Sequence, residues 1–87
     1  MYYVYILQSR KKLDWLYKGH TSNLKKRFGD HNKGKNFSTA PYAPFKLIYY
    51  EAYLLKTDAQ AREDYLKTSM GKRVIKKQLR HFFELKS

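Results

Sequence analysis

Three blocks of hydrophobic residues along the chain have the length and residue types of strands. They cover 2–7, 15–18 and 45–53, and each is rich in tyrosine, valine, isoleucine or leucine. Such side chains suit a pleated, partly buried surface, so we expect three strands. Because only a short polar turn at 10–14 separates the first two blocks, these should pair as an antiparallel hairpin.

The segment after the second block has helical spacing. Four residues fall at positions i, i+3, i+4 and i+7 and therefore share one helical face: Leu24, Arg27, Phe28 and His31. Gly19 should end the preceding strand, and Asn23 offers a side-chain oxygen that can cap the helix. Gly34 is well placed to close it. We therefore predict a helix over about 23–32.

Two further helices follow the third hydrophobic block. Thr57 with Gln60 matches a capping box, which predicts a helix from there to about Ser69. Gly71 should break that helix, and 72–85 should form another, with its apolar stripe facing the sheet. The predicted order is β-β-α-β-α-α. We expect a small α+β layered fold, in which helices flank a three-stranded antiparallel sheet.

Composition indicates one compact, strongly basic unit. A chain of 87 residues with 43% hydrophobic positions predicts a single domain over 1–87. Lysine and arginine number 19 against 7 acidic residues, for a formal charge of +12. A polyanion would relieve this self-repulsion, and nucleic acid is favoured over an acidic membrane surface or general solubility.

Other composition features narrow the function classes. No apolar run is long enough to span a bilayer, and the first residues lack the basic start and cleavage site of a signal peptide. The sequence has no cysteine, which excludes disulfides and cysteine-ligated zinc. We expect a cytoplasmic protein.

Charged residues on apolar helical faces are the candidate functional groups. Arg27 and His31 lie one turn apart on such a face, shortly after Tyr17. Glu63 also falls on a stripe that should face the sheet, where an unpartnered carboxylate is costly. Two explanations are open for Glu63: a structural ion pair with Arg62 or Lys67, or a shared cleft with the other charged and tyrosine residues.

Taken together, the motifs resemble the GIY-YIG nuclease family. Tyr3-Val4-Tyr5 and Tyr17-Lys18-Gly19 are similar to the two motifs that name the family. The stretch 21–27 with His31 resembles its first helix, and 61–67 resembles the segment that bears its acidic residue. The resemblance covers nearly the whole chain. It is strongest to small stand-alone members and to the N-terminal nuclease domain of the excinuclease that acts in excision repair.

The resemblance implies divalent-metal-dependent hydrolysis of DNA, with Mg²⁺ or Mn²⁺ as cofactor. Tyr5 would be the general base toward the attacking water, and Tyr17 would hydrogen-bond around the phosphate. Arg27 would stabilise phosphoryl charge, His31 would assist proton transfer, and Glu63 would be the sole protein ligand of the metal. Tyrosine has an ordinary pKa of about 10 and histidine of about 6.5, so His31 is the chemically easier base and a rival to Tyr5.

The sequence departs from the family pattern at three places. Tyr3 replaces the glycine of the first motif, and Lys18 replaces the isoleucine of the second. Several family members have an asparagine about three turns after the acidic residue. Here that region reads Val74-Ile75-Lys76, and no asparagine follows Asn36.

Basic residues outside the motifs are candidates for tracking a nucleic-acid backbone. The DNA-contacting set predicted here is Lys18, Lys33, Lys35, Lys46, Lys72, Arg73 and Lys76. Tyr42, Phe45 and Tyr49 are candidates for base stacking. We expect an endonuclease selective for DNA structure, similar to repair or recombination enzymes. The alternatives are a non-catalytic nucleic-acid-binding module of the same fold, and a subunit to which a protein partner delivers the substrate.

Overall fold

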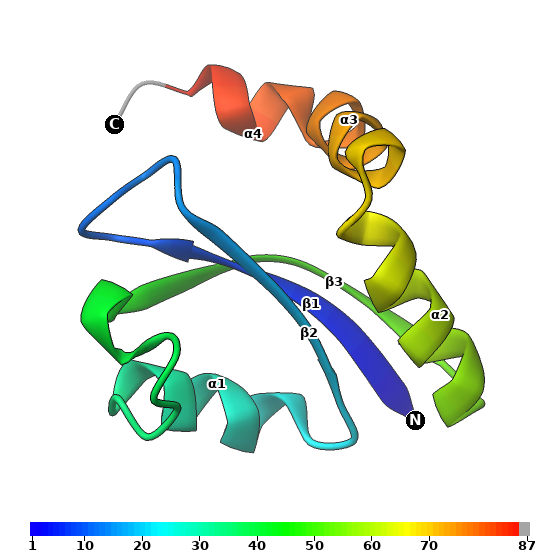
Figure 1. The fold of residues 1–87 in the computed structure, drawn as a ribbon, viewed down its shortest axis with the longest axis horizontal. Helices are drawn as coiled ribbons and strands as arrows, with labels where there is room; N and C mark the ends of the chain where they lie inside the picture. Colours follow the sequence, from blue (N-terminus) through cyan, green and yellow to red (C-terminus); the bar gives the residue numbers. More distant parts are fainter. Residues whose placement is uncertain (86–87) are drawn as a thin grey trace.

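A computed structural model describes residues 1–85. In this part of the chain the elements follow one another in the order β-β-α-β-α-α-α, with a short 3-10 helix before the third strand (Figure 1). Their bounds are β1 Tyr2–Ser9, β2 Leu16–Thr21, α1 Leu24–Asn32, the 3-10 helix Ala40–Tyr42, β3 Phe45–Tyr53, α2 Lys56–Leu66, α3 Ser69–Gln78 and α4 Arg80–Glu84.

The three strands form one antiparallel sheet in the order β2-β1-β3. The central strand β1 pairs with both neighbours, so β2 is an edge strand. Helix α1 lies on one side of the sheet, and α2 and α3 lie on the other (Figure 1). The predicted fold class and the β1–β2 hairpin are therefore confirmed.

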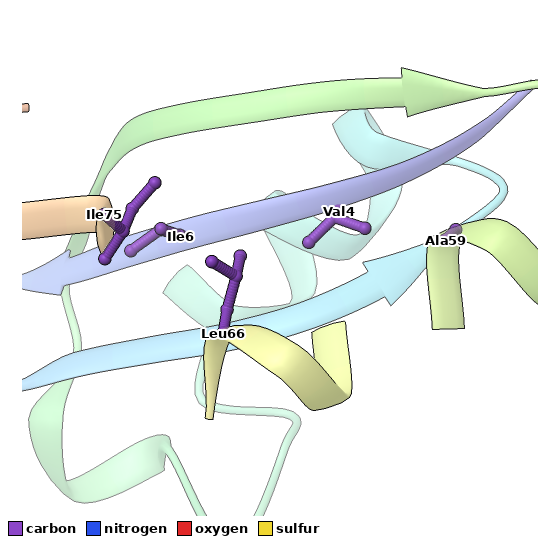
Figure 2. Packing of buried hydrophobic residues seen from close by; sticks show 5 residues of the cluster. All are labelled: Val4, Ile6, Ala59, Leu66 and Ile75. Atoms are coloured by element: carbon purple, nitrogen blue, oxygen red, sulfur yellow. The ribbon is translucent and has the colours of Figure 1, made fainter. Parts of the chain in front are cut away.

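Alternation along β1 supplies two apolar cores, one on each face of the sheet. Val4 and Ile6 point toward α2 and α3, where they cluster with three buried residues of those helices (Figure 2). Tyr5 and Leu7 point to the opposite face and cluster with Phe45, under α1. The central strand thus contributes two buried side chains to each of the two cores.

The prediction that Gly19 ends the second strand was wrong. Strand β2 continues to Thr21, and Gly19 is buried within it, directly opposite Tyr5 in the register. A Cβ built at position 19 would lie 2.6 Å from the Tyr5 hydroxyl oxygen. Glycine is needed here because an aromatic side chain crosses the strand, and not because the chain turns.

The predicted capping box and the predicted helix break at Gly71 were also wrong. Helix α2 begins at Lys56 without a side-chain cap, and α3 begins at Ser69, where the Thr68 hydroxyl accepts a hydrogen bond from the Gly71 amide at 3.1 Å. Gly71 lies inside α3. A Cβ there would overlap the carbonyl of Tyr65, so the missing side chain permits close approach of the two helices.

The last predicted helix is divided. Helix α3 ends at Gln78, and Leu79 separates it from the five-residue helix α4. Among the residues that the structure describes, no helix is long and apolar enough to cross a membrane.

Candidate active site

A chain of hydrogen bonds connects the central strand to α1 and to the loop that follows it. The Tyr5 hydroxyl oxygen lies 3.0 Å from Nε2 of His31, and Nδ1 of the same ring lies 2.9 Å from the Thr39 hydroxyl. All three residues are at most 1% exposed. The Thr39 hydroxyl also lies 3.4 Å from the Asn36 carbonyl oxygen, to which it can only donate.

This arrangement determines the favoured tautomer of His31. Because the Thr39 hydroxyl donates to a carbonyl, it accepts from Nδ1–H of His31. Nε2 then carries a lone pair and accepts the hydrogen bond from Tyr5. The site therefore holds a neutral imidazole that is oriented to take the Tyr5 proton.

The ionisation of the two rings follows from their burial. Burial raises the pKa of Tyr5, with a further increase from Tyr17, while Arg27 opposes the shift. Burial lowers the pKa of His31, and the charge of Arg27 lowers it further. At neutral pH the tyrosine is therefore protonated and the histidine is neutral. A free Tyr5 phenolate is disfavoured unless its proton moves to a neighbouring group.

Tyr17 and Arg27 complete this half of the site. The centroids of the Tyr17 and His31 rings are 5.0 Å apart, and the Tyr17 and Tyr5 centroids are 6.2 Å apart. Arg27 is exposed on α1, and its charge acts on both Tyr5 and His31. Five residues line a surface cavity of about 280 Å³ at this point: Arg27, Asp30, His31, Lys35 and Asn36.

Glu63 lies on the other face of the sheet, near the same edge strand. Alternation in β2 directs Gly19 toward α1 and His20 toward α2. Nδ1 of His20 donates to one oxygen of Glu63, and the Lys67 ammonium donates to the other at 2.5 Å. The predicted pair with Lys67 is present. Arg62, the other predicted partner, binds Glu51 instead, at 2.7 Å.

Glu63 and Tyr5 both approach strand β2, from opposite sides. Glu63 contacts His20, and the Tyr5 hydroxyl lies against Gly19, the preceding residue of the strand. The charge of Glu63 adds to the effect of burial in raising the pKa of Tyr5. The five predicted site residues therefore form two groups, Tyr5, Tyr17, Arg27 and His31 on one face and Glu63 on the other, separated by β2.

Sequence reasoning missed the roles of His20 and Thr39. His20 is not among the predicted site residues, but it is partly buried against Glu63. The alternation of β2 could have placed it on the α2 face. Thr39 lies in a loop, and no periodic signal connects it to His31.

Glu63 has the chemistry of a ligand for a hard cation. Carboxylate oxygen is a preferred ligand of Mg²⁺, which keeps several waters and commonly takes only one or two protein carboxylates. Residues 1–85 contain no group of three histidine, cysteine or acidic side chains arranged to hold a metal. The donor set therefore fits a single protein ligand, provided that the cation replaces a partner of Glu63. Burial favours the neutral acid, but the hydrogen bonds from His20 and Lys67 outweigh it and lower the pKa of Glu63.

The predicted DNA-contacting residues lie in separate places. Burial lowers the pKa of Lys18, and the charges of Lys72 and Lys67 lower it further. Of these three lysines, Lys67 pairs with Glu63. Lys46 instead lies over the Phe82 ring, 5.4 Å from its centroid. The remaining members are exposed, two after the end of α1 and two on α3: Lys33, Lys35, Arg73 and Lys76.

The predicted stacking residues are already occupied. Tyr42 stacks on Trp15 with ring centroids 3.9 Å apart, and Phe45 is 1% exposed in the core. The Tyr49 hydroxyl donates to Glu51 at 2.5 Å. These contacts make the three rings part of the folded framework, so their proposed role in base stacking is not supported.

The arrangement of sheet, helices and polar residues matches a known family. The three-stranded antiparallel sheet carries Tyr5 on β1 and Tyr17 on β2, with the arginine and histidine on α1 and the glutamate on α2. Residues 1–78 match the model of the GIY-YIG catalytic domain, and the chain therefore belongs to the GIY-YIG family. Membership of this family implies nuclease activity in general.

The curated relatives belong to the small UPF0213 proteins. One from Clostridium perfringens is 44% identical over 68 residues, which cover 77% of this chain and 71% of that protein. One from Streptococcus pyogenes serotype M5 is 40% identical over 62 residues, which cover 70% of this chain and 65% of that protein. No solved structure was found to match the chain.

Proposed function

We propose that this protein is a divalent-metal-dependent endonuclease that hydrolyses DNA phosphodiester bonds. The observation that supports this most directly is the hydrogen bond from Tyr5 to the lone pair of His31, at 3.0 Å. A purely structural tyrosine does not need a neutral, oriented histidine as its acceptor. This pair also lies beside Arg27, which lines the same surface cavity as His31.

In the proposed mechanism, Tyr5 and His31 act as one base. An attacking water transfers a proton to the Tyr5 oxygen as it bonds to phosphorus, while the Tyr5 proton moves to Nε2 of His31 and the bond from phosphorus to the leaving oxygen breaks. Because Nε2 of His31 is hydrogen-bonded to Tyr5, the histidine acts through the tyrosine in this proposal. A tyrosine with a raised pKa could then serve as a base, because its own proton would pass to His31.

Thr39 is a positioning residue in this mechanism. Its hydroxyl accepts from Nδ1–H and so keeps the lone pair on Nε2, where the Tyr5 proton must arrive. When His31 becomes protonated, the hydrogen bond to Thr39 stabilises the imidazolium that forms. Arg27 supplies fixed positive charge for the negative charge that accumulates on the phosphoryl oxygens.

Glu63 would hold the cation, with water and phosphate oxygens as the other ligands. A bound divalent cation would supply Lewis-acid polarisation of the phosphate and stabilisation of the leaving oxygen. The partner that the cation does not replace, His20 or Lys67, would orient the carboxylate in place of the asparagine that several family members have. The segment where that asparagine is expected instead provides Ile75, which is 1% exposed in the core.

One observation favours a second candidate, a nucleic-acid-binding module without turnover. Both carboxylate oxygens of Glu63 are paired with protein donors, and the Lys67 ammonium already neutralises the charge that would attract a cation. The net charge of +12 would support DNA binding in either case.

A panel of labelled DNAs separates the two candidates. Single-stranded, nicked, flapped, branched and duplex substrates are incubated with Mg²⁺ or Mn²⁺ and with EDTA, beside the Glu63→Ala protein. We expect metal-dependent cutting by the wild type alone, with a preference for certain DNA structures. Salt-sensitive binding of the same DNAs without cutting would instead support the binding module.

A further inference from the structure

The loop between α1 and the 3-10 helix displays a phenylalanine to solvent. Phe37 is 95% exposed, the highest value among the large hydrophobic side chains within residues 1–85. The residue before it, Asn36, lines the cavity together with Arg27 and His31. Two positions after it comes Thr39, the hydrogen-bond partner of His31. Phe37 thus lies, in the sequence, between two residues of the candidate active site.

Local hydrogen bonds give the loop a defined shape. The side-chain oxygen of Asn36 accepts from the Ser38 amide at 3.1 Å and from the Ser38 hydroxyl at 2.8 Å. The Asn36 carbonyl accepts from the amides of Thr39 and Ala40, at 3.1 and 2.9 Å. Phe37 therefore sits at the outside of a closed turn. Its exposure follows from this turn geometry, in which its two neighbours, Asn36 and Ser38, are hydrogen-bonded to each other.

The charge around the ring indicates the kind of partner. Lys33 and Lys35 are exposed on the same loop, and Arg27 and Lys35 both line the adjoining cavity. An exposed aromatic ring on a segment that also carries cations is the combination that binds single-stranded nucleic acid, through base stacking and phosphate contacts. Bases inside a duplex are covered on both faces by their neighbours, whereas an unpaired base at a flap or junction offers a free face.

We propose that Phe37 stacks on an unpaired base next to the phosphate that is cleaved, and that this contact makes the enzyme selective for flapped or branched DNA. The proposal rests on the proposed function, because it places the reaction centre beside His31. It assigns the choice of DNA structure to one residue that takes no part in the chemistry. It also explains why the framework aromatics Tyr42 and Phe45 are not needed for stacking.

The test measures binding in EDTA, so that cleavage plays no part. A flapped DNA and a matched duplex each carry 2-aminopurine, in the flap at the first unpaired position. Four proteins are compared: wild type, Phe37→Ala, Phe37→Tyr and Leu54→Ala. Leu54 is 78% exposed and follows the end of β3, so its substitution controls for the loss of an exposed hydrophobic side chain.

We expect the wild type to bind the flap about tenfold or more tightly than the duplex, with a change in 2-aminopurine fluorescence, as stacking on an aromatic side chain predicts. Phe37→Ala should lose this preference and the fluorescence change but keep its duplex affinity, whereas Phe37→Tyr and Leu54→Ala should match the wild type. Equal flap preference in the wild type and Phe37→Ala would overturn the proposal, as would the absence of DNA binding by the wild type. Because no metal is present, a protein that never cleaves DNA would still give either result.

Discussion

Replacing Gly19 with alanine tests whether the site depends on the passage of Tyr5 across strand β2. The added Cβ would lie 2.6 Å from the Tyr5 hydroxyl oxygen, 2.8 Å from its Cζ and 3.0 Å from Cε2 of Tyr17. Ordinary contact begins near 3.4 Å, so the hydroxyl must move by about 0.8 Å (3.4 − 2.6). Both rings are held by the buried cluster under α1, which leaves little room for this movement.

The expected cost follows from this displacement. If the hydroxyl retreats from His31, the 3.0 Å hydrogen bond lengthens to as much as about 3.8 Å and is lost. A shift of this size in a reacting group costs about 10²-fold in rate. Overpacking of the strand should also lower the free energy of unfolding by about 1–3 kcal/mol.

The assay combines urea unfolding with single-turnover cleavage of the best substrate, measured where both proteins are fully folded. Gly29→Ala is the matched control, because a Cβ at that position of α1 meets no atom within 4 Å. It should keep wild-type activity and gain about 0.5–1 kcal/mol of stability from helix propensity. Wild-type cleavage by Gly19→Ala would refute the proposed geometry of Tyr5.

Three other changes test separate parts of the structure. Thr39→Val leaves Nδ1–H of His31 without its acceptor and should slow cleavage about tenfold or more. Thr39→Ser keeps a hydroxyl and should cleave at about the wild-type rate. Equal rates for the two variants would contradict the positioning role. Cleavage should stay constant as the pH falls to the ordinary histidine pKa of about 6.5 and decrease only below it, through the lowered pKa of His31, because only the neutral ring can take the Tyr5 proton; a rate that stays flat until the protein unfolds would contradict this. Gly71→Ala should lower the free energy of unfolding by about 3 kcal/mol or more, because the new Cβ overlaps the backbone carbonyl of Tyr65, which cannot rotate away. An unchanged midpoint of urea unfolding would show that α2 and α3 are not packed as described.

Hydrophobic patterning was enough to predict the three strands, the first helix and a helical segment after the third strand, but not the division of that segment into α2, α3 and α4. The third strand was predicted at 45–53 and is observed at Phe45–Tyr53, and the first helix was predicted to within one residue. Gly34 closes that helix with a φ of +73°, as its position indicated. These features depend on local propensity and on period, which a single sequence contains.

The errors share a cause, since they concern glycines and charges whose roles depend on distant residues. Gly19 and Gly71 resemble breaks in regular structure when only the sequence is considered. In the structure, each position needs a glycine because atoms of another element lie where a Cβ would be. Likewise, the contact of His20 with Glu63 joins residues 43 positions apart. Sequence periodicity assigns each to a face, but only the packing of α2 beside β2 brings the two side chains together.

The candidate site was recovered from the sequence chiefly by resemblance to the family. Periodicity alone placed Arg27, His31 and Glu63 on helical faces, without relating the first two to the third. The structure adds the tautomer of His31, the coupling of Glu63 to Tyr5 and the pairing of both Glu63 oxygens. These features depend on side-chain geometry, which the spacing of residues along the sequence does not predict.

The role of Glu63 is the central claim, and its charge can be removed with little change of shape. Glu63→Gln is compared with Asp64→Asn, a matched loss of charge at the next, exposed position of α2. Single-turnover cleavage is measured over a series of Mg²⁺ concentrations, and DNA binding is measured in EDTA. We predict that Glu63→Gln loses cleavage at every Mg²⁺ concentration and retains binding, while Asp64→Asn behaves as the wild type. Cleavage by Glu63→Gln at the wild-type rate, with the same dependence on Mg²⁺, would contradict the assignment of Glu63 as the metal ligand.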